Sequence, residues 1–306
     1  LAAMVEEEDA PEILTVTPGT GTSARWLQRT NSNTGEQLGR LRDRVLDAAQ
    51  IQRHHVVMDL NAGSGLLASD ILRRAPERGT WALARDRQAG EGLRQQAERL
   101  PEIERPVVLV GEPDELRDLL ILRGEEALRF DAVVGRNALG PLPDKAATLS
   151  LVGEYLKPGG TLSLAETVVK QAQRLYELVD LSTLGDDLSQ RVREAEEQIY
   201  VAPDVPLVNW LPADLQGALE MAGFENDGIG EQAHEADVLV SPDTIGHWFA
   251  TEDYRERPSY AQHLLRYITD EELAKVRALY EQQLAGQTVR WRTRIAFVVG
   301  KKAAET

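Results

Sequence analysis

Five short apolar segments alternate with segments of helical periodicity, and this alternation constrains the fold more than any other feature of the chain. The apolar segments have the length of buried strands, and small-residue turns lie beside several of them. Strands that alternate with helices form a mostly parallel, doubly wound sheet with right-handed crossovers. The sequence therefore predicts an α/β fold whose first five strands are residues 55–60, 80–84, 106–110, 130–134 and 161–165.

Helix boundaries are marked by capping and breaking residues. Thr34 and Gln37 have capping-box spacing, so a helix is expected to begin near Thr34. A later helix is expected to end at Lys157-Pro-Gly-Gly160, because proline cannot continue it. Beyond residue 166 the alternation lapses. The expected elements there are a charged helical segment over 168–198, helices over 211–222 and 269–284, and strands over 237–240 and 294–300.

The chain is expected to form one domain behind an N-terminal arm. Residues 1–24 are first acidic and then rich in proline, glycine and threonine, which is typical of a linker. Residues 25–306 would form the domain, with insertions at about 170–210 and 241–287 that are expected to carry substrate specificity. The printed chain begins with Leu1 rather than Met, which fits a piece of a longer protein.

Composition excludes several function classes. The formal net charge is -16, and a general nucleic-acid surface needs lysine and arginine to neutralise phosphate. The chain has no cysteine, so disulfides, thiol nucleophiles and cysteine-based zinc sites are excluded. The sequence shows no secretory signal and no apolar stretch of the roughly 18 residues that a membrane span needs. We therefore expect a cytoplasmic protein with a small-molecule or protein substrate.

The segment from Asp59 to Gly65, Asp-Leu-Asn-Ala-Gly-Ser-Gly, carries the main chemical signal. It closes a predicted strand and opens a predicted helix, and its glycines let a ligand approach the backbone. Leu66, Leu67 and Ala68 follow Gly65, so the third glycine of the GxGxxG pattern of dinucleotide enzymes is missing. The turn therefore disfavours a nicotinamide cofactor.

This acid followed by a Gly-x-Gly turn resembles the first motif of class I S-adenosylmethionine-dependent methyltransferases. Three further segments are similar to elements of that family, in the family's order: residues 130–143, 156–164 and 211–224. The resemblance covers about residues 35–225 and the last strand. It implies a Rossmann-like sheet of about seven strands with helical insertions late in the chain, and S-adenosylmethionine as the cofactor.

The resemblance also assigns cofactor roles, residue by residue. Asp59 would orient the glycine loop, Glu112 would meet adenine, and Arg136 with Asn137 would lie over the methionine end. For Glu112 an ordinary helix N-terminal acid is an equal alternative. The residues assigned to the cofactor are Asp59, Asn61, Ala62, Gly63, Gly65, Asp86, Glu112, Arg136 and Asn137.

One position departs from the family pattern. The acid that usually ends strand two and binds the ribose hydroxyls falls near Ala84, and Asp86 is the nearest carboxylate that could replace it. A carboxylate at this position would favour an enzyme, whereas an apolar residue that fills it would favour a non-catalytic interaction module.

Two function classes therefore stay open, a methyltransferase and a methyltransferase-like interaction module. No catalytic base follows from the sequence, and methyl transfer can proceed by positioning alone. The acidic entry and the ending over residues 282–291 are also faintly similar to the C-terminal domain fused to some bacterial AAA+ ATPases of the replication-associated recombination type. This second resemblance implies a fused or associated ATPase as partner.

Overall fold

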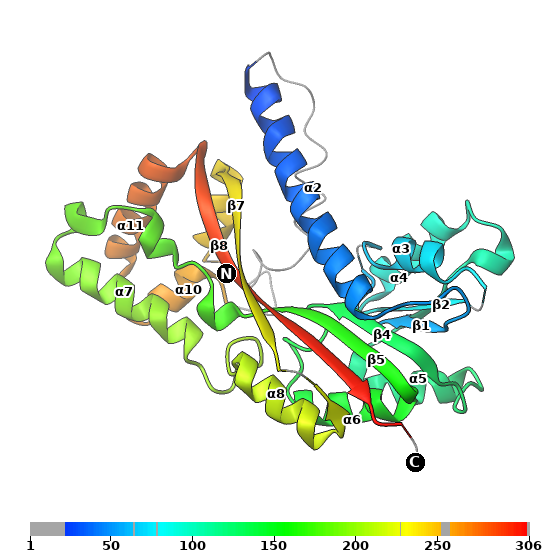
Figure 1. The fold of residues 1–306 in the computed structure, drawn as a ribbon. Coiled ribbons are helices and arrows are strands. Elements are labelled where there is room, and N and C mark those ends of the chain that lie inside the picture. Colours follow the sequence, from blue (N-terminus) through cyan, green and yellow to red (C-terminus); the bar gives the residue numbers. More distant parts are fainter. Residues whose placement is uncertain (1–21, 64, 78, 227, 252–257, 305–306) are drawn as a thin grey trace. The chain divides into compact units, whose positions relative to one another are not determined.

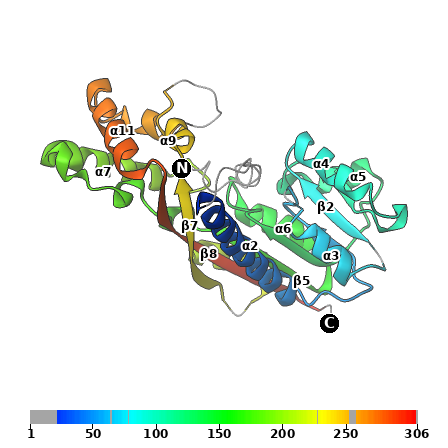
Figure 2. The ribbon, with the colours of Figure 1, turned by 90° about the horizontal axis from the view of Figure 1, so that it is seen from above.

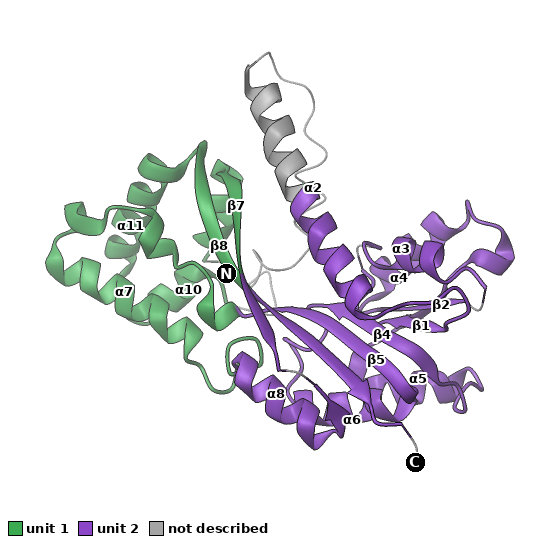
Figure 3. Ribbon diagram, viewed as in Figure 1, with its two compact units in different colours: residues 1–35, 169–209, 233–294 green, residues 36–168, 210–232, 295–306 purple. Residues whose placement is uncertain are grey.

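The computed structural model describes residues 22–304 except residues 64, 78, 227 and 252–257, and for residues 22–34 only the backbone. The chain divides into two compact units (Figure 3). We call residues 36–168, 210–232 and 295–306 the sheet unit, and residues 1–35, 169–209 and 233–294 the helical unit.

The strands agree with the predicted α/β pattern. They are β1 (Val57–Asp59), β2 (Thr80–Ala84), β3 (Val107–Val110), β4 (Phe130–Arg136), β5 (Leu156–Thr167), β6 (Phe224–Glu225), β7 (Gly230–Val240) and β8 (Gln287–Lys302). Seven of them form a continuous path in the order β3-β2-β1-β4-β5-β8-β6, and β7 pairs with β8 beside that path (Figure 1). The path is parallel from β3 to β5, while β8 runs antiparallel to β5 and to β6. The expected doubly wound sheet of about seven strands is confirmed.

Helices cover both faces of this sheet, because consecutive strand residues point to opposite sides. The helices that pack on the sheet are α2 (Thr22–Ala48), α3 (Ala68–Arg74), α4 (Arg87–Ala97), α5 (Leu116–Leu122), α6 (Lys145–Tyr155) and α8 (Pro212–Met221). On β4, Ala132 and Val134 belong to the apolar cluster that contains α2 and α3 residues. These two helices lie on the same side of the sheet (Figure 1 and Figure 2). Val133 between them belongs to the cluster of α5, α6 and α8.

Two predicted boundaries differ from the structure. The helix expected to begin near Thr34 begins at Thr22, so the Thr34–Gln37 spacing lies inside α2 rather than at its start. No proline interrupts the segment after Thr22, and the buried Leu41, Val45 and Leu46 fix the helix further along. The predicted arm lies outside the described residues up to residue 21, and its last residues belong to α2.

The Lys157-Pro-Gly-Gly160 turn ends α6 as expected, but it also enters the sheet. Its residues lie within β5, where the register jumps from Phe130↔Leu156 to Ala132↔Thr161. Gly159 has φ +75°, a conformation that glycine adopts at little cost. The segment is therefore an irregular start of β5 rather than a free loop.

The helical unit contains short helices around its own apolar core. Its elements are α7 (Asp186–Tyr200), α9 (Pro242–Trp248), α10 (Tyr260–Leu264), α11 (Asp270–Leu284) and the 3-10 turns η5 (Val169–Gln171), η6 (Leu175–Leu178) and η7 (Leu181–Leu184). The expected helical segment over 168–198 is continuous only from Asp186, because Gly185 with φ +82° separates α7 from the turns. The expected helix over residues 269–284 is confirmed as α11, and Thr269 and Glu272 form a capping box at its start.

A buried glutamate holds the turns of the helical unit in place. Glu196 on α7 is fully buried, and its carboxylate accepts the N–H groups of Leu175 and Tyr176 and the hydroxyl of Tyr260 at 2.8 Å. The Tyr280 hydroxyl lies 3.1 Å from that of Tyr260. Burial raises the pKa of Glu196 to about 7, against the effect of these hydrogen bonds.

Within the described residues, none of the helices combines the length and the hydropathy that crossing a membrane requires.

Removing the Tyr260 hydroxyl should destabilise the helical unit. Tyr260→Phe leaves the buried Glu196 carboxylate with one donor fewer, which we expect to cost about 1–3 kcal/mol. Tyr267→Phe is the matched control, because Tyr267 is exposed. Urea unfolding of both variants measures the difference, and equal free energies of unfolding would contradict the role of this hydroxyl.

Candidate functional site

Four of the five parallel strands, β1 to β4, end at one edge of the sheet, and we call the loops that follow them the carboxyl edge. Ligands of doubly wound sheets bind outside this edge. The loops begin after Asp59, Ala84, Val110 and Arg136. All nine residues assigned to a cofactor from sequence lie on the ends of these strands or on the loops that follow them.

The loop after β1 is tied to the strands on either side of it. Leu60 donates its N–H to the carbonyl of Val134 in β4, and Ala62 donates to that of Leu83 in β2, both at 2.8 Å. Gly65 has φ +67°, and a Cβ there would lie 3.2 Å from Gln96 Oε1. Gly63 is exposed, its φ lies outside the left-handed region, and its Cβ would meet Ala89 at 3.9 Å. Only position 65 therefore needs glycine for its backbone conformation, whereas a side chain at position 63 would enter open space.

Asp59 carries a buried carboxylate that the described residues satisfy only in part. The residue is 0% exposed, and its Oδ1 accepts the Asn61 N–H at 3.2 Å. Oδ2 is buried and has no hydrogen-bond partner in the part of the chain that the structure describes. Burial raises the pKa of Asp59 to about 7, although the Asn61 bond lowers it. A cationic group placed at Oδ2 would supply the missing partner.

The end of β2 differs from what an acidic ribose site needs. Ala84 is fully buried in the last β2 position. Asp86 is exposed, and its Oδ1 accepts the N–H of Ala89 at 2.8 Å as the N-cap of α4. At least one carboxylate oxygen of Asp86 is therefore used to cap α4.

Arg85, between these two residues, was not assigned from sequence. Its Nη2 donates to the carbonyls of Ala138 at 2.8 Å and Asn137 at 3.3 Å, in the loop after β4. Its Nε lies 3.4 Å from Oε2 of Glu112, in the loop after β3. Glu112 in turn has its own N–H bonded to Glu115 Oε2, so it also begins the 3-10 turn η4 (Pro113–Glu115). One guanidinium thus joins three loops of the carboxyl edge.

The loop after β4 is organised by Glu166, which sequence analysis also missed. This glutamate is fully buried, and its carboxylate accepts three successive N–H groups, those of Ala138 at 2.8 Å, Leu139 at 3.1 Å and Gly140 at 3.0 Å. Burial raises the pKa of Glu166, against these three bonds and the nearby Arg85. An acid near the end of the buried β5 was the only signal in the sequence.

Asn137 fixes the same loop to β5. It has φ +50°, a left-handed conformation that asparagine tolerates better than most residues. Its N–H donates to Ala165 and its Oδ1 accepts the N–H of Thr167, both at 2.9 Å. The Asn61 side chain reaches the same loop, where its Nδ2 donates to the carbonyl of Arg136 at 2.8 Å. Asn61, Arg136 and Asn137 are therefore brought together.

Two further cations lie near Glu166. Burial lowers the pKa of Arg136 to about 10, with Glu166 acting in the opposite direction. Burial likewise lowers the pKa of Lys145 to about 8, and its Nζ donates to the carbonyl of Leu142 at 2.9 Å. Among the described residues, no group of three or more acidic or histidine side chains could hold a metal ion.

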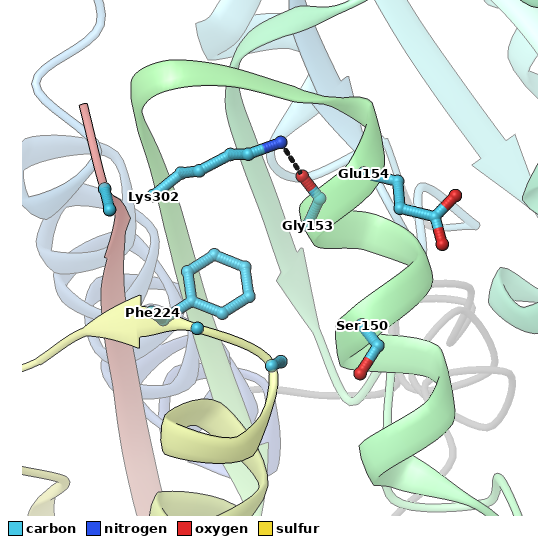
Figure 4. Close-up of a pocket in the computed structure, with 8 residues that line it drawn as sticks. Ser150, Gly153, Glu154, Phe224 and Lys302 are labelled. Carbon is cyan, nitrogen blue, oxygen red and sulfur yellow. Dashed lines mark hydrogen bonds between the residues drawn. The ribbon is translucent and has the colours of Figure 1, made fainter. Parts of the chain in front are cut away.

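A pocket of about 240 Å³ lies away from this edge, between the C-terminal half of α6 and the turn before β6 (Figure 4). Lys302 reaches across it and donates to the carbonyls of Gly153 at 2.6 Å and Leu156 at 3.0 Å. A lysine that binds the last carbonyls of a helix stabilises its end. None of the residues predicted to bind a cofactor lines this pocket.

The two glycines of the first loop should respond differently to alanine. Gly65→Ala places a Cβ in a left-handed backbone, which costs about 1–2 kcal/mol. Gly63→Ala should change the free energy of unfolding by less than about 0.5 kcal/mol, because its Cβ meets only ordinary contacts. Denaturant unfolding separates the two, and equal losses would show that the loop conformation is different.

Asp59 should make stability depend on pH in one direction. Its pKa is raised from 3.8 to about 7 in the folded chain, so the native state holds a proton that the unfolded state has lost between these values. The wild type should therefore lose stability relative to Asp59→Asn as pH rises from about 4 to 7, by up to about 1.4 kcal/mol per pH unit. Unfolding of both proteins at several pH values measures this, and a constant difference would exclude the raised pKa.

Comparisons with known proteins identify the fold. No protein-family profile matches the chain, and no curated protein does. Among solved structures, a candidate methyltransferase from Bacillus halodurans C-125 is 14% identical with a TM-score of 0.50, over 86% of this chain and 99% of that one. A mycolic acid cyclopropane synthase complexed with SAH and CTAB is 14% identical with a TM-score of 0.49, over 90% and 85%. Together with the strand order, the first likeness shows that this chain has the Rossmann-like fold of that candidate methyltransferase.

Proposed function

We propose that the carboxyl edge binds S-adenosylmethionine and that the protein transfers its methyl group to a small-molecule or protein acceptor. The observation that carries the proposal is Asp59, a fully buried carboxylate whose Oδ2 has no partner among the described residues. A buried charge without a partner is costly, and such groups are concentrated where a ligand completes the site. The methionine part of S-adenosylmethionine carries an ammonium group, which would be the missing partner of Asp59 Oδ2.

The remaining residues of the edge would bind the other parts of the cofactor. Gly63 leaves room beside the first loop, and Glu112, which lies beside Arg85, would meet the amino group of adenine. Arg136 and Asn137 would border the methionine end, where Glu166 keeps their loop rigid. We keep Asp86 as the proposed ribose partner through the carboxylate oxygen that does not cap α4.

The cofactor would supply an electrophilic methyl group, and the residues of the chain would position it. Transfer from a sulfonium needs an aligned acceptor and exclusion of water more than it needs a base. The polar bonds of the edge serve that purpose, since they fix the loops after β1 and β4 relative to each other. No side chain is assigned to proton transfer.

A non-catalytic interaction module is the second candidate, and the end of β2 favours it. Ala84 is apolar where the family has an acid, and Asp86 is engaged in capping. Arg85 adds a positive charge at this point of the edge. The association with an ATPase and the cytoplasmic location remain predictions from sequence alone.

Calorimetric titration with S-adenosylhomocysteine tests the proposal. The wild type should bind, and Gly63→Val should weaken binding at least about tenfold, because 1.4 kcal/mol corresponds to a factor of ten and the new side chain occupies ligand space. Gly63→Val should still fold, since its Cβ meets nothing closer than 3.9 Å. Gly92→Val is the control, on α4 with nothing within 4 Å of its Cβ.

Absence of binding in the wild type would favour the interaction module. Equal binding by wild type and Gly63→Val would place the ligand elsewhere than at the first loop.

A further inference from the structure

Arg85 lies across the middle of the carboxyl edge. It starts at the end of β2 and its guanidinium contacts the loop after β4. Strand β1 lies between β2 and β4 in the sheet, so this side chain crosses the end of β1. Asp59 is the last residue of β1 and Asn61 follows in its loop. The side chain therefore spans the region that the proposed cofactor would enter.

The partners of Arg85 are groups that the ligand would need. Glu112, which is proposed to meet adenine, is 3.4 Å from the Arg85 Nε. The carbonyls of Asn137 and Ala138 border the proposed methionine end. Arg85 also brings a fixed positive charge, and S-adenosylmethionine carries a cationic sulfonium. Both the shared acceptor and the like charge put Arg85 and the cofactor in competition.

Arg85 can leave without unfolding the edge. The loop after β4 is held independently of it by the three N–H bonds to Glu166 and by the bonds of Asn137 to β5. The Arg85 Nε lies 3.4 Å from Glu112 Oε2, which is longer than an ordinary hydrogen bond, and this Nε has no hydrogen bond in the described structure. The side chain is 22% exposed, so it has a path to solvent.

We propose that Arg85 is a gate that closes the cofactor site through its contacts with Glu112 and the loop after β4, and opens when the cofactor displaces it. The proposal rests on the proposed function. Because its charge opposes the sulfonium, the gate lowers the affinity for S-adenosylmethionine more than that for S-adenosylhomocysteine, which lacks this charge.

The test measures the affinities of both compounds by calorimetry in wild type, Arg85→Ala and Arg85→Gln. Arg85→Ala should bind S-adenosylhomocysteine about tenfold more tightly and S-adenosylmethionine more tightly still. Arg85→Gln keeps donors without charge, so it should recover part of the gain. Arg87→Ala is the matched control, because Arg87 is an exposed first residue of α4 and should leave both affinities unchanged. Thermal unfolding verifies that each variant is folded.

The outcomes separate the gate from the proposed function. Binding by wild type with weaker or unchanged binding by Arg85→Ala overturns the gate and leaves the proposed function standing. Binding only by the Arg85 variants supports the gate and counts against methyl transfer by the wild type. Failure of wild type and folded Arg85 variants to bind either compound overturns both. An equal gain for the two compounds overturns the role of charge.

Discussion

The carboxyl edge depends on the buried carboxylate of Glu166. Its three backbone donors come from consecutive residues of the loop after β4, so one side chain fixes the path of that loop. Hydrogen bonds to a charged group are worth about 1.5–3 kcal/mol each, and a buried carboxylate needs several of them to offset its desolvation. Arg85, Asn61 and Asn137 all bind this loop or extend from it. Without Glu166, the loop that these three residues contact or belong to would not be held in one position.

Glu166 and Asp59 are both fully buried, yet they differ in how the chain satisfies them. Glu166 has three backbone donors, whereas Asp59 has one. The first is typical of a structural carboxylate, and the second is typical of a functional one, because proteins leave local rules unsatisfied mainly at functional sites. Arg85 contributes a positive charge to the same edge, and its Nε has no hydrogen bond in the described structure. The carboxyl edge therefore combines a fixed loop after β4 with two side chains, Asp59 and Arg85, that lack part of their hydrogen bonds in the described structure.

Sequence patterns predicted the sheet and its first loop because these depend on local periodicity. The five strands were placed within a few residues, and the left-handed Gly65 follows from the need for a tight turn. Glu166 and Arg85 could not be found this way. Glu166 binds residues 26 to 28 positions away, and Arg85 reaches residues more than 50 positions away. Such contacts depend on how the strands are ordered, which spacing alone does not reveal.

The start of α2 shows a second limit. Thr34 and Gln37 have the right spacing for a cap, but the helix continues through them from Thr22 because nothing upstream breaks it. The role of Asp86 is a similar case, since an acid that follows a strand also begins a helix and its side chain can serve the helix first. Local signals therefore indicated a candidate site, and tertiary contacts determine how the side chains there are used.

The most direct test of the account is amide hydrogen exchange of the wild-type protein with and without S-adenosylhomocysteine. The account predicts slower exchange with ligand in residues 59–65, after β1, and in residues 137–140, after β4. No change in residues 59–65 at a ligand concentration that saturates binding would contradict it, because the first loop would then not be the site.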